Sequence, residues 1–184
     1  MQKLVLTEEQ QMLKDAARGL FSEQAPVSQL RKLRDDKDPL GYVPEFWNQA
    51  VELGLAGTLI PESHGGSEFG HVGMGQVMEE GGRTLAASPL FASGVLGACA
   101  LMLAGNDSQK ETLKAIADGS HLMALAIDEA GRHQPLRVAT RAEARDGGFV
   151  LNGRKTFVVD GHIANTLIVS ARTSGSEGDE AGIQ

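Results

Sequence analysis

The chain has 184 residues, of which 41% are hydrophobic and 22% are charged, a globular composition that allows one good core or two smaller ones. With 17 basic and 24 acidic side chains, its formal net charge of -7 gives no electrostatic footprint for a nucleic acid or an anionic membrane. No apolar run reaches the ~18 residues of a membrane span, and the first residues do not resemble a secretory signal. We therefore expect a cytoplasmic protein whose partners are small molecules or protein surfaces.

Helical patterns fill the first 120 residues. Thr7 followed by Gln10 matches a capping box, and apolar residues at helical spacing continue to Phe21. Ser108 and Glu111 match a second capping box. Further helices are predicted over residues 27–34, 44–53, 74–85, 89–105 and 109–119.

From His121 the pattern changes to short β-rich runs separated by Gly, Asn, Asp or Pro. The stretch "FVLNGRKTFVVDG", residues 149–161, is interpreted as two strands joined at Asn152-Gly153, and residues 173–180 as a polar loop or linker. The predicted fold class is α+β: an all-α helical domain over residues 1–120, followed by an incomplete antiparallel β domain over residues 121–184. Its outer strand edges need pairing or cover.

Several residues that could carry chemistry are better explained structurally. The five histidines are scattered without metal-ligand spacing, so no metal is expected, and Cys99 alone forms no internal disulfide. The glycines of "SHGGSEFGHVGMG" follow no strand and predict a structural loop rather than a phosphate-binding one. The adjacent acids of "MEEGGR" point about 100° apart on a helix, so at least one is expected on the solvated face.

An ordered series of segments resembles the acyl-CoA dehydrogenases, flavin enzymes that desaturate acyl thioesters. The segments in the helical region are "LTEEQQMLKDAARGLFSE", "FWNQAVELGLAGTLIPESHGG", "VMEEGGRTLAASPL" and "GNDSQKETLKAIADGS". Those in the β region are "ALAIDEAG", "GGFVLNGRKTFVVDG" and "ANTLIVSART". The resemblance covers nearly the whole chain in the family's order, which is more specific than any single motif.

The resemblance implies that the β domain forms one wall of an FAD site. Leu125, Ile127 and Asp128 match the strand that approaches the flavin, and Phe157 and Val159 match a second contact strand. In the family, a C-terminal helical bundle completes the site and supplies the glutamate base. That bundle is absent from this sequence, so no residue is assigned to catalysis.

Both flavin contacts depart from the family's pattern. Thr-Glu-Pro followed by Gly-Ser-Asp is usual at the first contact, whereas this chain has Asp128-Glu129-Ala130 followed by "GRHQPL". At the second contact, an aromatic residue, one further residue and a Ser or Thr are usual, but here Val159 replaces the hydroxyl. Valine donates no hydrogen bond and an ionised aspartate only accepts, so we expect FAD to be weakly held or absent.

The implied function is the FAD-dependent α,β-desaturation of an acyl-CoA, in fatty acid or acyl-CoA catabolism. The implied partners are the acyl-CoA substrate, an electron-transfer flavoprotein or similar acceptor, and further subunits in a homo- or hetero-oligomer. Two alternatives remain open. The chain could be a flavin-poor, non-catalytic subunit of a hetero-oligomeric dehydrogenase, or a binding or scaffold module with the same fold.

Overall fold

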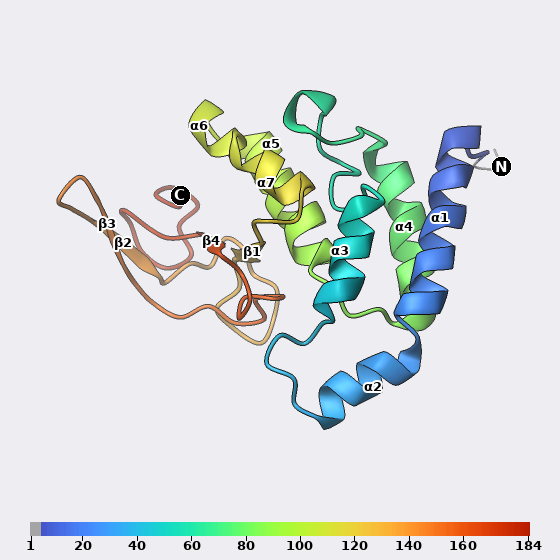
Figure 1. Ribbon diagram of the computed structural model, residues 1–184. Coiled ribbons are helices and arrows are strands. Elements are labelled where there is room, and N and C mark those ends of the chain that lie inside the picture. Colours follow the sequence, from blue (N-terminus) through green and yellow to red (C-terminus); the bar gives the residue numbers. More distant parts are fainter. Residues whose placement is uncertain (1–4) are drawn as a thin grey trace. The chain divides into compact units, whose positions relative to one another are not determined.

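The computed structural model describes residues 5–184, which form two compact units (Figure 1). The first unit ends at Leu122 and the second begins at Met123. The first is built from helices and loops, and the second holds all the strands of the described residues.

The first unit follows the predicted helical pattern. Its elements are α1 (Glu8–Gln24), α2 (Val27–Asp35), α3 (Pro44–Glu52), η1 (Glu62–His64), α4 (Gly70–Thr84), η2 (Leu90–Gly97), α5 (Ala98–Ala104), α6 (Asp107–Lys110) and α7 (Thr112–Ala117). The capping box that opens α1 is confirmed, because the Gln10 amide donates to Thr7 Oγ1 and the Gln10 side chain accepts from the Thr7 amide. Pro44 begins α3 as expected.

Helix boundaries differ from the prediction most clearly at the starts of α4 and α6, and the predicted helix 109–119 is divided into α6 and α7. Helix α4 begins at Gly70 rather than near Met74. A Cβ at Gly73 would lie 2.6 Å from Phe69 Cβ, so close packing favours a glycine-rich first turn that propensity alone argues against. The second capping box is formed by Asn106 and Gln109 rather than by Ser108 and Glu111. Both pairs have the same spacing, and Asn caps a helix as well as Ser does.

The core of the first unit lies where α1, α3 and α4 meet. Phe21 and Phe46 are buried with ring centroids 5.6 Å apart, and Val77 of α4 is fully buried. Figure 1 shows α1 and α4 running side by side. The loop before α4 needs its glycines, because Gly65 has φ +81 and a Cβ at Gly66 would lie 1.9 Å from the Ile60 carbonyl oxygen. This geometry confirms the structural interpretation of those glycines.

The second unit contains β1 (Met123–Ala126), β2 (Arg141–Arg145), β3 (Gly148–Asn152) and β4 (Thr166–Val169). Strands β2 and β3 are antiparallel as predicted, but β1 and β4 pair in parallel. The expectation of antiparallel strands throughout is therefore wrong for that pair. The long connection between β1 and β4, which includes the β2–β3 hairpin, permits parallel pairing.

The hairpin lies elsewhere than the sequence indicated. Its turn is Asp146-Gly147, with φ of +50 and +81, and not Asn152-Gly153. Both dipeptides favour this two-residue turn, so the sequence alone does not distinguish them. A Cβ at Gly153 would lie 2.2 Å from Thr140 Oγ1, so that glycine serves a close approach between segments instead of a turn.

The chain after β4 folds back on itself around Arg172. The amide of Ala171 donates to Gln184 O and the amide of Gln184 donates to Ala171 O. The Arg172 side chain is fully buried and donates to the carbonyl oxygens of Val138, Ser174, Ala181 and Asp179. Residues 173–180, interpreted as a loop or linker, thus form a closed loop in which the carbonyl groups of Ser174 and Asp179 accept hydrogen bonds from the buried Arg172 guanidinium.

Candidate functional site

The candidate flavin-contact residues belong to two segments of the second unit. Leu125 lies in β1, and Ile127 and Asp128 follow it directly; all three are partly buried. Phe157 and Val159 lie between β3 and β4. Phe157 has φ +52 and Val159 is in a turn, so the expectation that both residues lie on a second contact strand is wrong. Their side chains are 77% and 44% exposed.

The fold brings the two segments together. The Thr156 amide donates to the Asp128 carbonyl oxygen across 2.7 Å, which places the residue before Phe157 beside the end of the first segment. An open pocket lies between them, lined by Glu129, Ala130, Gly131, Arg154, Lys155, Thr156 and Phe157. Phe157 therefore shares its pocket with the residues just after Asp128, while Leu125 and Ile127 lie outside this lining.

Asp128 is engaged by its own loop. Its carboxylate oxygens lie 3.0 and 3.1 Å from His133 Nδ1, and one of them accepts from the Gln134 amide. The hydrogen bond with His133 lowers the pKa of Asp128, so the group is ionised at neutral pH. The Asp128 carboxylate is thus already hydrogen-bonded within its own loop.

A largely buried ion pair, Glu129 with Lys155, forms part of the pocket lining. Lys155 Nζ donates to Glu129 Oε1 (2.8 Å), to the Ile127 carbonyl oxygen (3.0 Å) and to Ser170 Oγ (2.9 Å), and its side chain is 9% exposed. Burial opposes the charge of Glu129, but hydrogen bonds from Lys155 and from the amides of Ala139 and Thr140 outweigh it and lower its pKa to about 2. The Glu129 carboxylate is therefore ionised at neutral pH.

Sequence reasoning did not single out Glu129, Lys155 or Ser170. Glu129 directly follows Asp128 in the first contact segment, and Lys155 stands before Phe157 in the second. The available signal was a pair of opposite charges, Glu129 and Lys155, each beside one of the two apolar segments that were expected to meet. It has low specificity, because most such charges lie on solvated surfaces.

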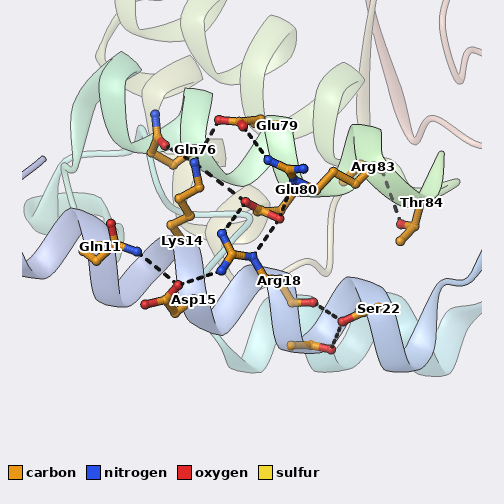
Figure 2. A network of polar contacts seen from close by, with 12 residues as sticks. Gln11, Lys14, Asp15, Arg18, Ser22, Gln76, Glu79, Glu80, Arg83 and Thr84 are labelled. Atoms are coloured by element: carbon orange, nitrogen blue, oxygen red, sulfur yellow. Dashed lines mark hydrogen bonds and ion pairs between the residues drawn. The ribbon is translucent and has the colours of Figure 1, made fainter. Parts of the chain in front are cut away.

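A second polar network joins α1 to α4 in the first unit (Figure 2). The Glu80 carboxylate is 1% exposed and accepts from Arg18 (3.0 Å) and Arg83 (3.0 Å). Its neighbour Glu79 is 48% exposed and pairs with Lys14 and Arg83. The expectation that at least one of these adjacent acids is on the solvated face is confirmed, and the network fits a structural role.

Other residues offer little further chemistry. Within residues 5–184, no group of three His, Cys, Asp or Glu side chains is arranged to hold a metal ion. None of the helices in that range is both long and apolar enough to cross a membrane. Cys99 is a partly buried free thiol whose pKa is raised by burial.

Comparison with known proteins identifies the family. Residues 7–120 match the domain described as "Acyl-CoA dehydrogenase, N-terminal domain". The mitochondrial isovaleryl-CoA dehydrogenase of Pongo abelii is 32% identical over 173 residues, covering 91% of this chain and 40% of that protein.

Two solved structures have the same fold. The ChsE4-ChsE5 complex from Mycobacterium tuberculosis contains a chain that is 26% identical, with a TM-score of 0.81, over 94% of this chain and 46% of that one. An acyl-CoA dehydrogenase complexed with FAD from Bacillus anthracis is 25% identical, with a TM-score of 0.80, over 100% of this chain and 34% of that one.

These similarities define the fold as that of an acyl-CoA dehydrogenase, a helical domain followed by strands. The chain belongs to the acyl-CoA dehydrogenase family. It matches the N-terminal portion and spans less than half the length of each of the three relatives.

Proposed function

We propose that this chain is the N-terminal portion of an FAD-dependent acyl-CoA dehydrogenase, which removes hydrogen across the α,β bond of an acyl-CoA thioester. The observation that carries the proposal is the family match, which extends along nearly the whole chain with the segments in order. In this proposal residues 1–120 are the helical domain and residues 121–184 begin the β domain. The electron acceptor is an electron-transfer flavoprotein or a similar protein.

The residues present fit a flavin in part. The exposed ring of Phe157 and the half-exposed side chain of Val159 offer apolar surface to a flat ring system beside an open pocket. FAD, when bound, would supply the acceptor for a hydride from the substrate's β carbon. The proposed flavin-facing residues are Leu125, Ile127, Asp128, Phe157 and Val159, and their role is to contact and orient the ring. Position 159 offers no side-chain donor.

A second candidate function is that of a flavin-poor subunit in a hetero-oligomeric dehydrogenase. Two observations favour it: Val159 lacks a hydroxyl, and the Asp128 carboxylate is occupied by His133 and Gln134. In addition, one of the solved structures with the same fold is a chain of the ChsE4-ChsE5 complex from Mycobacterium tuberculosis, whose name gives two components. In this alternative a partner chain binds the working flavin.

Titration with FAD distinguishes these functions. The protein that contains this chain is purified and titrated with FAD, and binding is followed by the change in flavin fluorescence. The first function requires saturable binding, which we expect to be weak. Absence of binding up to millimolar FAD would contradict it and leave the flavin-poor subunit, which is then tested by assaying acyl-CoA desaturation with and without a co-purified partner chain.

A further inference from the structure

Lys155 occupies an unusual position in the second unit. An ammonium group has three N–H donors, and all three of Lys155 have partners: the Glu129 carboxylate, the Ile127 carbonyl oxygen and the Ser170 hydroxyl. The three partners lie on segments that follow β1 and β4. The Lys155 ammonium group therefore links the segment after β3 to the segments that follow β1 and β4.

Glu129 extends this connection to a fourth segment. Its carboxylate accepts from the Ala139 amide (2.7 Å) and the Thr140 amide (3.0 Å), just before β2 begins at Arg141. The carboxylate is 13% exposed, so these hydrogen bonds form where water competes poorly for them. The charged pair is thus the point at which the ends of all the strands of this unit are linked.

The ion pair is adjacent to both candidate flavin-contact segments. The next residue after Lys155 is Thr156, whose amide binds the Asp128 carbonyl oxygen, and Phe157 follows. Glu129 and Lys155 themselves line the pocket with Phe157. A shift of either side chain would move the Asp128 and Phe157 segments relative to each other.

We propose that Lys155, held by Glu129, is a positioning residue for flavin binding: it sets the distance and register between the Asp128 segment and the Phe157 segment. This inference rests on the proposed function. A buried ion pair gains little net stability over apolar residues of similar size, whereas its directional hydrogen bonds specify one arrangement. Lys155 acts through the backbone of its neighbours and does not touch the reacting atoms.

The test compares the parent chain with the double variant Glu129→Gln/Lys155→Met, which removes both charges and leaves neither buried alone. Amide hydrogen exchange is measured without FAD. The Thr156 amide, which bonds to Asp128, should exchange at least about tenfold faster, the equivalent of one lost hydrogen bond. The Ala142 amide donates to the Arg172 carbonyl oxygen and not to the ion pair, so its exchange rate should match that of the parent chain.

FAD titration of the same proteins gives the second readout. The double variant should bind FAD about tenfold more weakly than the parent chain, and the near-ultraviolet and visible circular dichroism of the bound flavin should change. The matched control is Glu111→Gln/Lys114→Met, an exposed ion pair of the first unit, which should alter neither measurement.

Each of the following results would overturn the inference. Equal exchange at Thr156 would mean that the pair does not hold the two segments. Faster exchange at Thr156 and Ala142 alike, or loss of the folded state, would make the pair a support of the whole unit instead. Unchanged FAD affinity would show that the ion pair does not support the flavin site, and would leave the proposed function intact. No FAD binding by the parent chain would reject both this inference and the proposed function.

Discussion

Among single residues, Val159 departs from the Ser or Thr that the family usually has at the second flavin contact, and this change bears most directly on FAD binding. It lies in a turn with 44% of its side chain exposed, beside the exposed ring of Phe157. Because a threonine hydroxyl is close in volume to the methyl group it replaces, it can be introduced there without overpacking. A hydroxyl at this position restores the donor that the family usually has.

We predict that Val159→Thr tightens FAD binding by about tenfold, the equivalent of one hydrogen bond. Fluorescence titration of the two proteins with FAD measures the difference. Val150→Thr on β3 is the control, since it makes the same chemical change outside the two candidate flavin-contact segments and should leave the affinity unaltered. Equal affinities for parent and Val159→Thr, or tight stoichiometric flavin in the parent, would contradict the role given to position 159.

Glu129 gives a residue-scale prediction about pH. Its pKa falls from 4.5 to about 2 on folding, so the folded state holds its proton less tightly than the unfolded state. Its contribution to stability is present above pH 4.5 and is lost as the pH falls through about 2. Glu129→Gln should therefore lower the free energy of unfolding at pH 7 and make its dependence on pH shallower between these values.

Urea unfolding at several pH values between 2 and 7 measures this slope. Glu143→Gln, an exposed change on β2, is the control and should leave the slope as in the parent chain. A Glu129→Gln protein with the parent's acid dependence would show that another group dominates the acid response.

At the scale of elements, the contact of α1 with α4 combines an apolar face with a buried carboxylate. Glu80 points inward and binds Arg18 across the interface, while Arg83 binds it from its own helix (Figure 2). Hydrogen bonding from Arg18 lowers the pKa of Glu80, which keeps the group ionised at neutral pH. A buried charge of this kind is costly when it loses a partner.

We expect Glu80→Gln to lower the free energy of unfolding by about 2 kcal/mol, because charge-assisted hydrogen bonds to a buried group are replaced by weaker ones. Glu79→Gln, on the adjacent and solvated position, should have little effect. Denaturant unfolding of both variants followed by far-ultraviolet circular dichroism makes the comparison. Equal losses would indicate that burial of Glu80 does not decide its contribution.

At the scale of the whole molecule, the second unit leaves apolar surface uncovered. On the hairpin, Ala142 pairs with Leu151 and Ala144 with Phe149, so these side chains share one face, and Phe149 and Leu151 are 59% and 48% exposed. Among residues 5–184, β3 forms a ladder only with β2. An exposed strand edge beside an apolar face is typical of a surface that another chain covers.

The chain is therefore expected to form at least a dimer, with itself or with a related chain. Light scattering at several micromolar concentrations measures the mass of the purified protein. A monomer across the whole range, with and without a co-purified partner, would contradict this expectation.

Sequence patterns were sufficient to predict the helical region, the position of the change to strands and the family. These features depend on local spacing: apolar residues recur with the helical period up to about residue 120, and the Thr7 capping box needs only its neighbour Gln10. The ordered family segments add long-range information that no single motif holds.

Long-range contacts select between local sequence signals that are equivalent on their own, such as the two dipeptides that could each form the hairpin turn. Asp146-Gly147 forms the turn because β2 and β3 pair on either side of it, whereas Gly153 is needed where the chain passes Thr140. The parallel pairing of β1 with β4 and the buried Glu129–Lys155 pair join residues far apart in the chain. Local periodicity does not predict such contacts, because they contribute free energy only when segments far apart in the chain come together.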